Sequence, residues 1–339
     1  MVYNAKPLYL LKPAHNTIPL QESIDSFQEL WLEKHDYEDK KTLFHYTDLN
    51  GLRGILENRA IWCGHVSSLN DPAELHYGRE LIKKILNEYI SKQESEEIRH
   101  FINAMIVQVE AFGQAMFHTF ISCFCESNNL LSQWRSYAAN GGGYSIGFEF
   151  SNKTKISSDI SNLGNISPLF LRKIIYNQSD QQDLISSYLD KAIDAVNRAI
   201  AKGIGEQYND MPNYVPSVMA MQATNVLLDM IISFKNPVFE SEQEWRLVRV
   251  AMENHQPDKL NFRENNNELI PYRQVYIFSQ QDDNSIFFPL NSIRFGPALE
   301  PVRTKAAIEL FLYKLSVDNH QIKILPSSVN ISSSGYSIR

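Results

Sequence analysis

The sequence has few cysteines and no long apolar run, and each absence excludes a class of protein. Its three cysteines are Cys63, Cys123 and Cys125. An odd number makes a poor disulfide framework, and two residues along one predicted strand are badly placed to bridge. No run approaches the length of a membrane span, and residues 1–16 lack the apolar core and cleavage site of a signal peptide. We therefore expect a protein of the reducing cytoplasm without a membrane partner.

A basic stripe is also missing. The formal net charge is -7 at pH 7, whereas proteins dedicated to duplex DNA neutralise phosphates with clustered lysine and arginine. This balance favours a protein or a single-stranded target over duplex DNA, and it leaves room for a nucleic-acid substrate in a local groove. A Walker-type phosphate loop is absent too, because Gly141-Gly142-Gly143 precedes a predicted strand and not a helix.

What the chain does contain suits a folded domain. Of its 339 residues, 43% are hydrophobic and 21% are charged, which is ordinary for a globular protein with a core. Strand and helix patterns are mixed without regular alternation, which favours an α+β fold around a split or mixed sheet. We expect one domain over residues 41–330 with a helical insertion near 178–233. An arm with a helix is expected at 1–40 and a tail at 331–339.

The expected elements follow from hydrophobic periodicity and from turn and cap signals. Strands are predicted at 42–46, 60–64, 119–125, 144–150, 173–176, 244–252, 272–278, 285–289, 292–295 and 321–325. Helices are predicted at 49–58, 71–91, 96–115, 130–138, 180–203, 216–233 and 302–315. The helix start at Asp71-Pro72-Ala73-Glu74 has the pattern of a capping box. Residues 151–168 are polar and are expected to form a surface loop.

The first candidate for chemistry is His45-Tyr46-Thr47, at the end of a predicted strand. A histidine followed two residues later by a hydroxyl can present two polar groups on one side of a strand. The same pattern fits a strand end whose histidine is solvated or hydrogen-bonded locally.

The second candidate is the short helix that contains Ser132, Trp134, Arg135 and Tyr137. Trp134 and Tyr137 are three residues apart and share a helix face. An aromatic face beside an arginine suits a planar ligand with a phosphate. It suits a helix that packs on a sheet equally well.

The third candidate is the acidic segment that leads into the strand at 244–252. Glu242, Glu244 and Arg246 alternate onto one face of this strand. Carboxylates at this spacing repel one another unless a cation or a polar ligand lies near them. The alternative interpretation is the exposed end of an edge strand.

Short motifs along the chain together resemble a known family. They are His45-Tyr46-Thr47, Asn70-Asp71-Pro72, Ser132-Gln133-Trp134-Arg135, Gly143-Tyr144-Ser145-Ile146-Gly147-Phe148, Glu242-Gln243-Glu244-Trp245-Arg246 and Arg294-Phe295-Gly296-Pro297. From about Leu43 to its end, the chain is similar to a bacterial domain-of-unknown-function family, family 2971. The order of a His-x-Thr strand, an aromatic helix and a Glu-x-Glu strand also resembles the ADP-ribosyltransferase fold.

The second resemblance implies an NAD-dependent ADP-ribosyltransferase, with NAD as its substrate. His45 would then hydrogen-bond the nicotinamide ribose, and Tyr46 and Thr47 would hold the carboxamide. Trp134 or Tyr137 would stack on the nicotinamide ring.

The same resemblance assigns the phosphates and the reacting sugar to other residues. Arg135 would meet the diphosphate with its planar guanidinium fork, and Ser132 would line the same site. Glu244 would stabilise the positive charge that develops as nicotinamide leaves, and Glu242 would orient or deprotonate the acceptor. Glu240 competes with both for the catalytic assignment.

The biological role implied is that of a toxin or phage-defence effector. Its acceptor would be an intracellular nucleic acid or protein, and an antitoxin or regulatory partner would control it. One alternative is a non-catalytic module of the same fold that binds a nucleotide or peptide. Another is a metal-dependent hydrolase, for which the available ligands match no standard zinc spacing. Those ligands are His45, His65, Asp71, Glu74 and His76.

Overall fold

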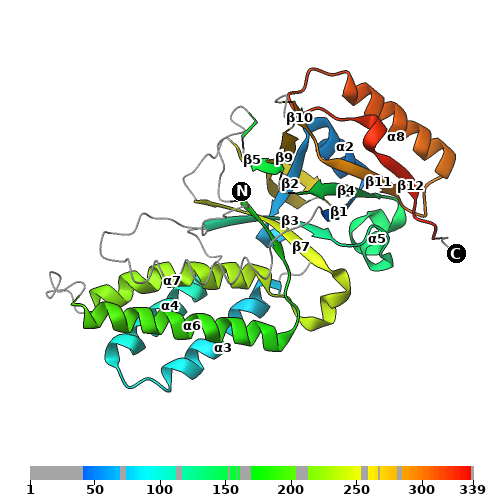
Figure 1. Cartoon of the computed structure of the whole chain (residues 1–339). Helices are drawn as coiled ribbons and strands as arrows, with labels where there is room; N and C mark the ends of the chain where they lie inside the picture. Colours follow the sequence, from blue (N-terminus) through cyan, green and yellow to red (C-terminus); the bar gives the residue numbers. More distant parts are fainter. Residues whose placement is uncertain are drawn as a thin grey trace.

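The computed structural model describes residues 41–68, 74–111, 117–151, 153–157, 159–160, 169–203, 213–252, 259–265, 268–280 and 285–336. Over these residues the chain has the α+β fold that the sequence predicted (Figure 1). The expected arm at 1–40 and the predicted helix start at Asp71 lie outside the described residues.

Strands and helices follow one another irregularly along the chain. The strands are β1 (Lys41–Thr47), β2 (Ala60–His65), β3 (Phe117–Cys125), β4 (Tyr144–Phe150), β5 (Thr154–Ser157), β6 (Leu169–Lys173), β7 (Glu244–Met252), β8 (Asn261–Asn265), β9 (Glu268–Gln280), β10 (Ile286–Phe287), β11 (Leu290–Phe295) and β12 (Asn330–Ser333). The helices are α2 (Leu49–Asn58), α3 (Glu74–Ile90), α4 (Glu96–Ala111), α5 (Leu131–Tyr137), α6 (Gln178–Ala201), α7 (Tyr214–Ser233) and α8 (Pro301–Ser316), and the short turn η4 covers Pro237–Glu242.

Most of these elements lie where the sequence predicted them, and the differences concern short strands. The segment 151–168, expected to be a loop, contains β5, because the long strand β9 offers it an edge. The strand predicted at 321–325 is reduced to one bridge, between Phe287 and Lys323. The last strand is β12 instead, and it takes residues 331–333 of the expected tail into the sheet beside β11. Pairing of this kind depends on which edge is available in space.

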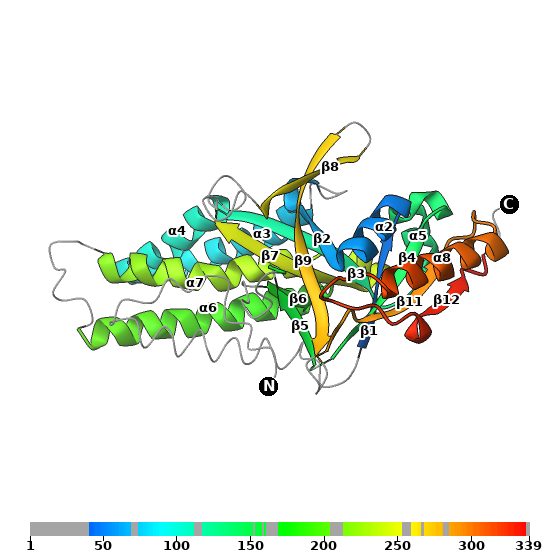
Figure 2. The same cartoon turned by 90° about the horizontal axis from the view of Figure 1, so that it is seen from above.

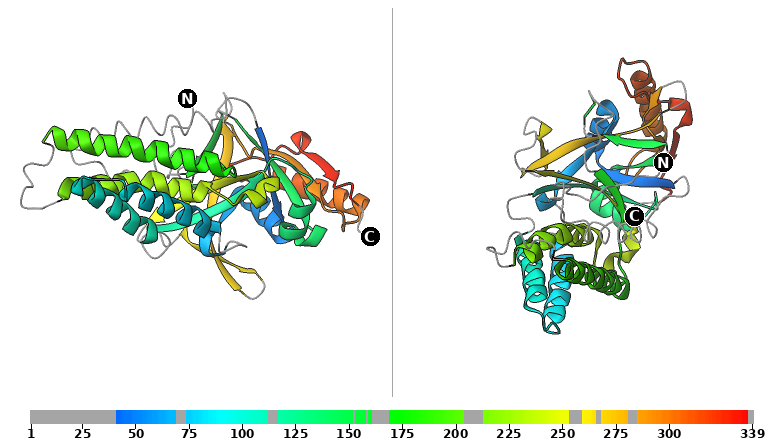
Figure 3. Two further views of the ribbon diagram at one scale, coloured as in Figure 1. Left: turned by 90° about the horizontal axis from the view of Figure 1, so that it is seen from below. Right: turned by 60° about the vertical axis from the view of Figure 1, so that its left-hand side comes forward.

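The central strand of the sheet is β3. One of its edges pairs with β7 along its whole length. The other edge is shared, because β2 pairs with Phe120 and Ile121 while β1 pairs with Cys125. The sheet therefore divides at β3 into one branch that continues through β2 and β9 and another that continues through β1, β4, β11 and β12. Figure 3 shows the two branches separating.

Each face of β3 and β7 packs on its own hydrophobic core. We call the face that carries Cys123, Cys125, Glu244 and Arg246 the helix face, because α3, α4, α6 and α7 form a bundle on that side (Figures 1 and 2). The opposite face, which carries Phe120 and Phe124, we call the split face. Its core joins both branches of the sheet with α2 and α8.

The bundle explains the apolar composition of α7. The expectation that no run approaches the length of a membrane span was wrong for α7, which is, among the described residues, the one helix long and apolar enough to cross a membrane. However, 61% of its most apolar stretch is buried inside the protein. Its side chains Leu227, Met230 and Ile231 are fully buried in the core that it shares with α3, α4 and α6. Packing within the bundle is sufficient to account for its composition.

Candidate functional site

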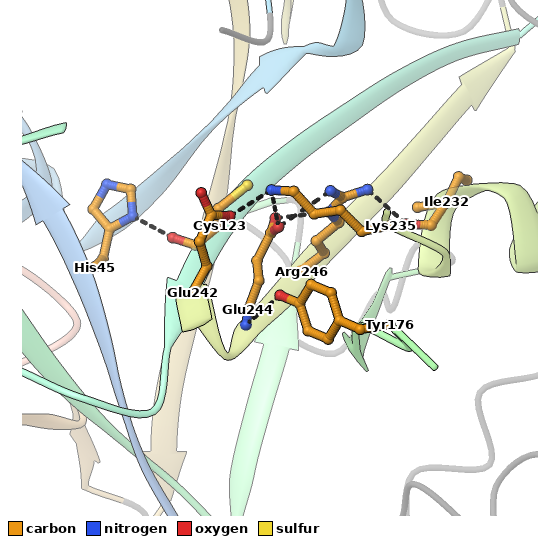
Figure 4. A network of polar contacts seen from close by, with 8 residues as sticks. All are labelled: His45, Cys123, Tyr176, Ile232, Lys235, Glu242, Glu244 and Arg246. Carbon is orange, nitrogen blue, oxygen red and sulfur yellow. Dashed lines mark hydrogen bonds and ion pairs between the residues drawn. The ribbon is translucent and has the colours of Figure 1, made fainter. Parts of the chain in front are cut away.

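The register of β1, β3 and β7 decides which candidate side chains meet. Phe44 pairs with Cys125, and Cys125 pairs with Glu244. Opposite residues of antiparallel strands point to the same face, and neighbours along a strand point to opposite faces. Glu244 therefore lies on the helix face and His45 on the split face, on either side of β3 (Figure 4).

His45 lies where β1 separates from β3. Its Nδ1 is 2.8 Å from the carbonyl oxygen of Cys123 and 3.5 Å from the hydroxyl of Ser122. The carbonyl can only accept a hydrogen bond, so Nδ1 carries the proton and Nε2 presents an acceptor lone pair. The imidazole thus donates a hydrogen bond to a backbone carbonyl of β3 at a point where β1 no longer pairs with β3.

The surroundings of His45 keep it neutral. Burial lowers the pKa of the imidazole below its usual 6.5, and the charge of Arg263 on β8 lowers it further. The hydrogen bond to the Cys123 carbonyl acts in the opposite direction but is outweighed. At neutral pH the side chain is therefore an anchored hydrogen-bond acceptor.

The glutamate of the predicted catalytic pair is held in an ion cluster. Glu244 is 5% exposed. Its Oε1 lies 2.7 Å from Nε of Arg246, and its Oε2 lies 2.8 Å from Nζ of Lys235. Burial alone would raise the pKa of this carboxyl group, but the charges of Arg246 and Lys235 outweigh burial and lower it to about 2. Both carboxylate oxygens of Glu244 therefore already form ion pairs within the protein.

Glu242 is the more accessible carboxylate of the same cluster. Its Oε2 is 2.5 Å from Nζ of Lys235, and its side chain is 18% exposed, against 6% for Glu244. Tyr137 of α5 lies at the edge of this cluster, where burial and then the charge of Glu242 raise the pKa of its phenol. The cluster balances two cations, Lys235 and Arg246, against two carboxylates.

Tyr46 and Trp134 pack against each other and form hydrogen bonds with the loop before α5. Trp134 is 1% exposed, and its indole N–H donates to Oδ1 of Asn129 at 2.9 Å. Its ring meets Tyr46 edge-on at 5.0 Å, and the Tyr46 hydroxyl donates to the carbonyl of Ser127 at 3.0 Å. These contacts hold α5 and the loop before it against β1. Tyr137, which is 37% exposed, is the aromatic side chain of α5 that a ligand could reach.

The remaining predicted residues are not drawn together. Ser132, Arg135 and Glu240 are exposed, and none of them forms an ion pair or side-chain hydrogen bond with another described residue. Thr47 is half-buried beside the first turn of α2, where a Cβ added to Gly51 would lie 1.8 Å from its hydroxyl oxygen. A ligand that used Arg135 and His45 together would have to reach around β1.

The sequence analysis missed two members of the ion cluster. Lys235 lies between both carboxylates, and the hydroxyl of Tyr176 accepts a hydrogen bond from the backbone N–H of Glu244 at 2.9 Å. The position of Lys235 offered a signal, because it is a single charge directly after the apolar end of α7. Buried lysines at such positions need a carboxylate partner.

A metal centre finds no support in the described part of the chain. There, no group of three or more histidine, cysteine, aspartate or glutamate side chains is placed to hold a metal ion. Cys63 and Cys125 are also unsuited to ligation or nucleophilic attack, because burial raises the pKa of each of these thiols to about 12.

Comparison with known proteins assigns a family to one part of the chain. Residues 133–247 match the model of the family described as "Protein of unknown function (DUF2971)". This match confirms the resemblance to family 2971 over a span that runs from α5 to β7. No curated protein and no solved structure matches the chain.

Proposed function

We propose that this member of the family of unknown function 2971 binds a nucleotide, with NAD as the first candidate, at the point where β1 and β2 separate along β3. The observation that carries the proposal is the state of His45. Its Nδ1 is anchored on the Cys123 carbonyl, and a lowered pKa keeps it neutral. The acceptor Nε2, which makes no hydrogen bond to another described residue, suits a ribose hydroxyl.

The charge around His45 supports the same ligand class. Arg263 is close enough to lower the pKa of the imidazole, and both carboxylates of the acidic segment lie on the other face of the sheet. The split face near His45 therefore favours an anionic ligand, as a nucleotide is. This arrangement best supports nucleotide binding near His45, without catalysis by Glu244.

ADP-ribosyl transfer from NAD to a macromolecule is the second candidate function. One observation favours it, which is that Glu242 keeps an accessible carboxylate beside the partly exposed ring of Tyr137. In this proposal Glu242 acts on the reacting sugar or on the acceptor, and Glu244 holds Lys235 in place. The acceptor would be a nucleic acid or a protein. A cytoplasmic location, a role as a toxin or phage-defence effector and control by an antitoxin belong to this candidate.

The test separates binding from turnover. NAD affinity is measured by calorimetry for the wild type, for His45→Ala and for His76→Ala, an exposed histidine on α3 that serves as the control. We expect His45→Ala to weaken binding about tenfold, the effect of one lost hydrogen bond to a buried group, and His76→Ala to leave it unchanged. Equal affinities for all three proteins would remove His45 from the site.

Turnover is followed with labelled NAD and a bacterial lysate. The transferase candidate predicts label in nuclease-sensitive or protease-sensitive material with the wild type, and its loss with Glu242→Gln. If the wild type binds NAD but neither labels the lysate nor releases nicotinamide, the transferase candidate is rejected and nucleotide binding without turnover is retained. Label that persists in Glu242→Gln would exclude this carboxylate.

A further inference from the structure

The strand β2 leaves an open space beside Gly64. Apart from its chain neighbours, no described residue has an atom within 4 Å of a Cβ added at Gly64. Gly64 pairs with Tyr272 of β9, and an aromatic side chain opposite a strand glycine can cover it. Tyr272 stacks instead on Trp62 of β2, with ring centres 4.7 Å apart and ring planes at 29°. The space beside Gly64 therefore lies next to an aromatic pair that does not fill it.

Trp62 brings a hydrogen-bond donor to the same side of β2, because it lies two residues before Gly64. Its indole Nε1 is buried and donates to no acceptor in the described part of the chain. The two other described tryptophans, Trp134 and Trp245, each donate to an acceptor at 2.9 Å. A buried N–H without an acceptor is unfavourable and uncommon in folded proteins. A ligand beside Gly64 would supply the acceptor that Trp62 lacks.

The open space lies near the ribose contact proposed at His45. Gly64 pairs with Ile121, and His45 bonds to the carbonyl of Cys123, two residues further along β3. At about 3.3 Å per residue, these two points on β3 are about 7 Å apart, which is within the length of one nucleoside. Between Ile121 and Cys125 no described strand pairs with this edge of β3. A ligand at this edge can therefore contact side chains from both faces of the sheet.

Arg263 of β8 is close to both His45 and Tyr272. Burial lowers the pKa of His45, and the charge of Arg263 adds to this effect. Burial raises the pKa of Tyr272, and the same charge partly offsets that rise. The side chain of Arg263 is exposed and forms no ion pair with a described residue. A guanidinium in this position suits the phosphate of a nucleotide whose sugar lies at His45.

We infer that the space beside Gly64 binds the adenine ring of the nucleotide. The ring would stack on the pair formed by Tyr272 and Trp62, and one of its ring nitrogens would accept a hydrogen bond from the Trp62 N–H. The nicotinamide ring of NAD carries a positive charge, which Arg263 would repel, whereas adenine is neutral. The inference rests on the proposed function, and it makes the adenosine end of NAD the part that contacts His45.

Adenosine tests this site without a phosphate or a nicotinamide ring. Its binding is measured by calorimetry for the wild type, for Trp62→Phe, which keeps an aromatic ring but lacks the N–H, and for Tyr313→Phe, an exposed tyrosine of α8 as the control. We expect Trp62→Phe to weaken adenosine binding about tenfold, the effect of one hydrogen bond to a buried donor, and Tyr313→Phe to leave it unchanged. Equal binding by all three proteins would overturn the inference, and so would tighter binding of nicotinamide riboside than of adenosine.

A second variant fills the open space and covers the case in which Trp62→Phe does not fold. Gly64→Val places a β-branched side chain in a strand, where such residues are favoured, at a position whose added Cβ meets no described atom within 4 Å. We expect its melting temperature to stay close to that of the wild type and its adenosine binding to fall at least tenfold. A folded Gly64→Val protein with wild-type affinity for adenosine would also overturn the inference.

Titrations with NAD on the same proteins distinguish this inference from the proposed function. NAD binding that is weakened by His45→Ala and by Gly64→Val supports both proposals. NAD binding that depends on His45 but is unchanged in Gly64→Val would retain the nucleotide function and refute the adenine site. Adenosine binding that depends on Gly64, in a protein whose NAD affinity His45→Ala does not change, would retain the adenine site and refute the ribose contact. Wild-type protein that binds neither adenosine nor NAD would refute both.

Discussion

His45 and Glu244 lie on opposite faces of the sheet, on either side of β3. Phe44, Cys125 and Glu244 form one row across β1, β3 and β7, so the neighbour of Phe44 in β1 points the other way. His45 bonds to the backbone of Cys123, while Glu244 bonds to Lys235 and Arg246 (Figure 4). One ligand cannot touch both side chains without passing through β3.

Glu244 is expected to act on stability and Glu242 much less so. Glu244→Gln leaves Lys235 and Arg246 buried with one carboxylate between them, and breaking a buried pair in this way costs about 3 kcal/mol. Glu242→Gln removes a partly exposed carboxylate and should cost about 1 kcal/mol. The free energies of unfolding are measured by urea denaturation. Equal losses for the two variants would contradict the structural role assigned to Glu244.

Acid should weaken the fold through the same carboxyl group. The pKa of Glu244 is about 2 in the folded protein, against the usual 4.5. A lowered carboxyl pKa gives stability that is fully present above about 4.5 and is lost as the pH falls towards about 2. The contribution is about 3 kcal/mol. Urea denaturation of the wild type and of Glu244→Gln across this range should converge as the pH falls, and curves that stay parallel would argue against the ion cluster.

His45 should resist protonation. Its pKa is lowered by burial, so the folded protein binds the proton less readily than the unfolded chain. The wild type should therefore lose stability as the pH falls below about 6.5, and His45→Gln should show a smaller loss over the same interval. The imidazole signals in an NMR titration give a direct measurement. A His45 that titrates at or above 6.5 would contradict the neutral acceptor.

Gly143 should tolerate no side chain. A Cβ at this position would lie 2.3 Å from the carbonyl oxygen of Thr47 and 2.8 Å from the carbonyl carbon of Ala138, both backbone atoms that cannot move away freely. Gly143→Ala is expected to destabilise the protein by about 2 kcal/mol. Gly64→Ala is the control, because nothing lies within 4 Å of its added Cβ, and it should change the free energy of unfolding by less than about 1 kcal/mol. Similar melting temperatures for the two variants would refute the close approach.

Local sequence signals predicted many elements because their causes are local. Asp48 accepts a hydrogen bond from Gly51 N–H at the start of α2, and the alternation of Glu244 to Met252 matches β7. The strands that were missed are short segments that pair with distant strands: β5 and β8 pair with β9, and β12 pairs with β11. Their pairing depends on a distant strand, which no local pattern contains.

Residue types alone could not settle which members of the site meet. The sequence marked His45, Glu242 and Glu244 as polar residues at strand spacing, and their chemistry made each a reasonable candidate. Whether they converge depends on the pairing of Phe44 with Cys125, since a shift by one residue would move every side chain of β1 to the other face. Arg249 and Arg273 could not be placed near each other from the sequence either. They lie in β7 and β9, two strands that do not pair directly and come close only because β2 and β3 lie between them in the sheet.

The sequence by itself determined the class of this protein, an α+β domain with a recognisable family segment at 133–247, because composition, periodicity and short motifs are properties of neighbouring residues. Only the tertiary structure decided that Lys235 pairs with both Glu242 and Glu244, and that His45 lies on the opposite face of the sheet from them. Both results depend on strand register and on the packing of the helix bundle, which bring together side chains that are far apart along the chain.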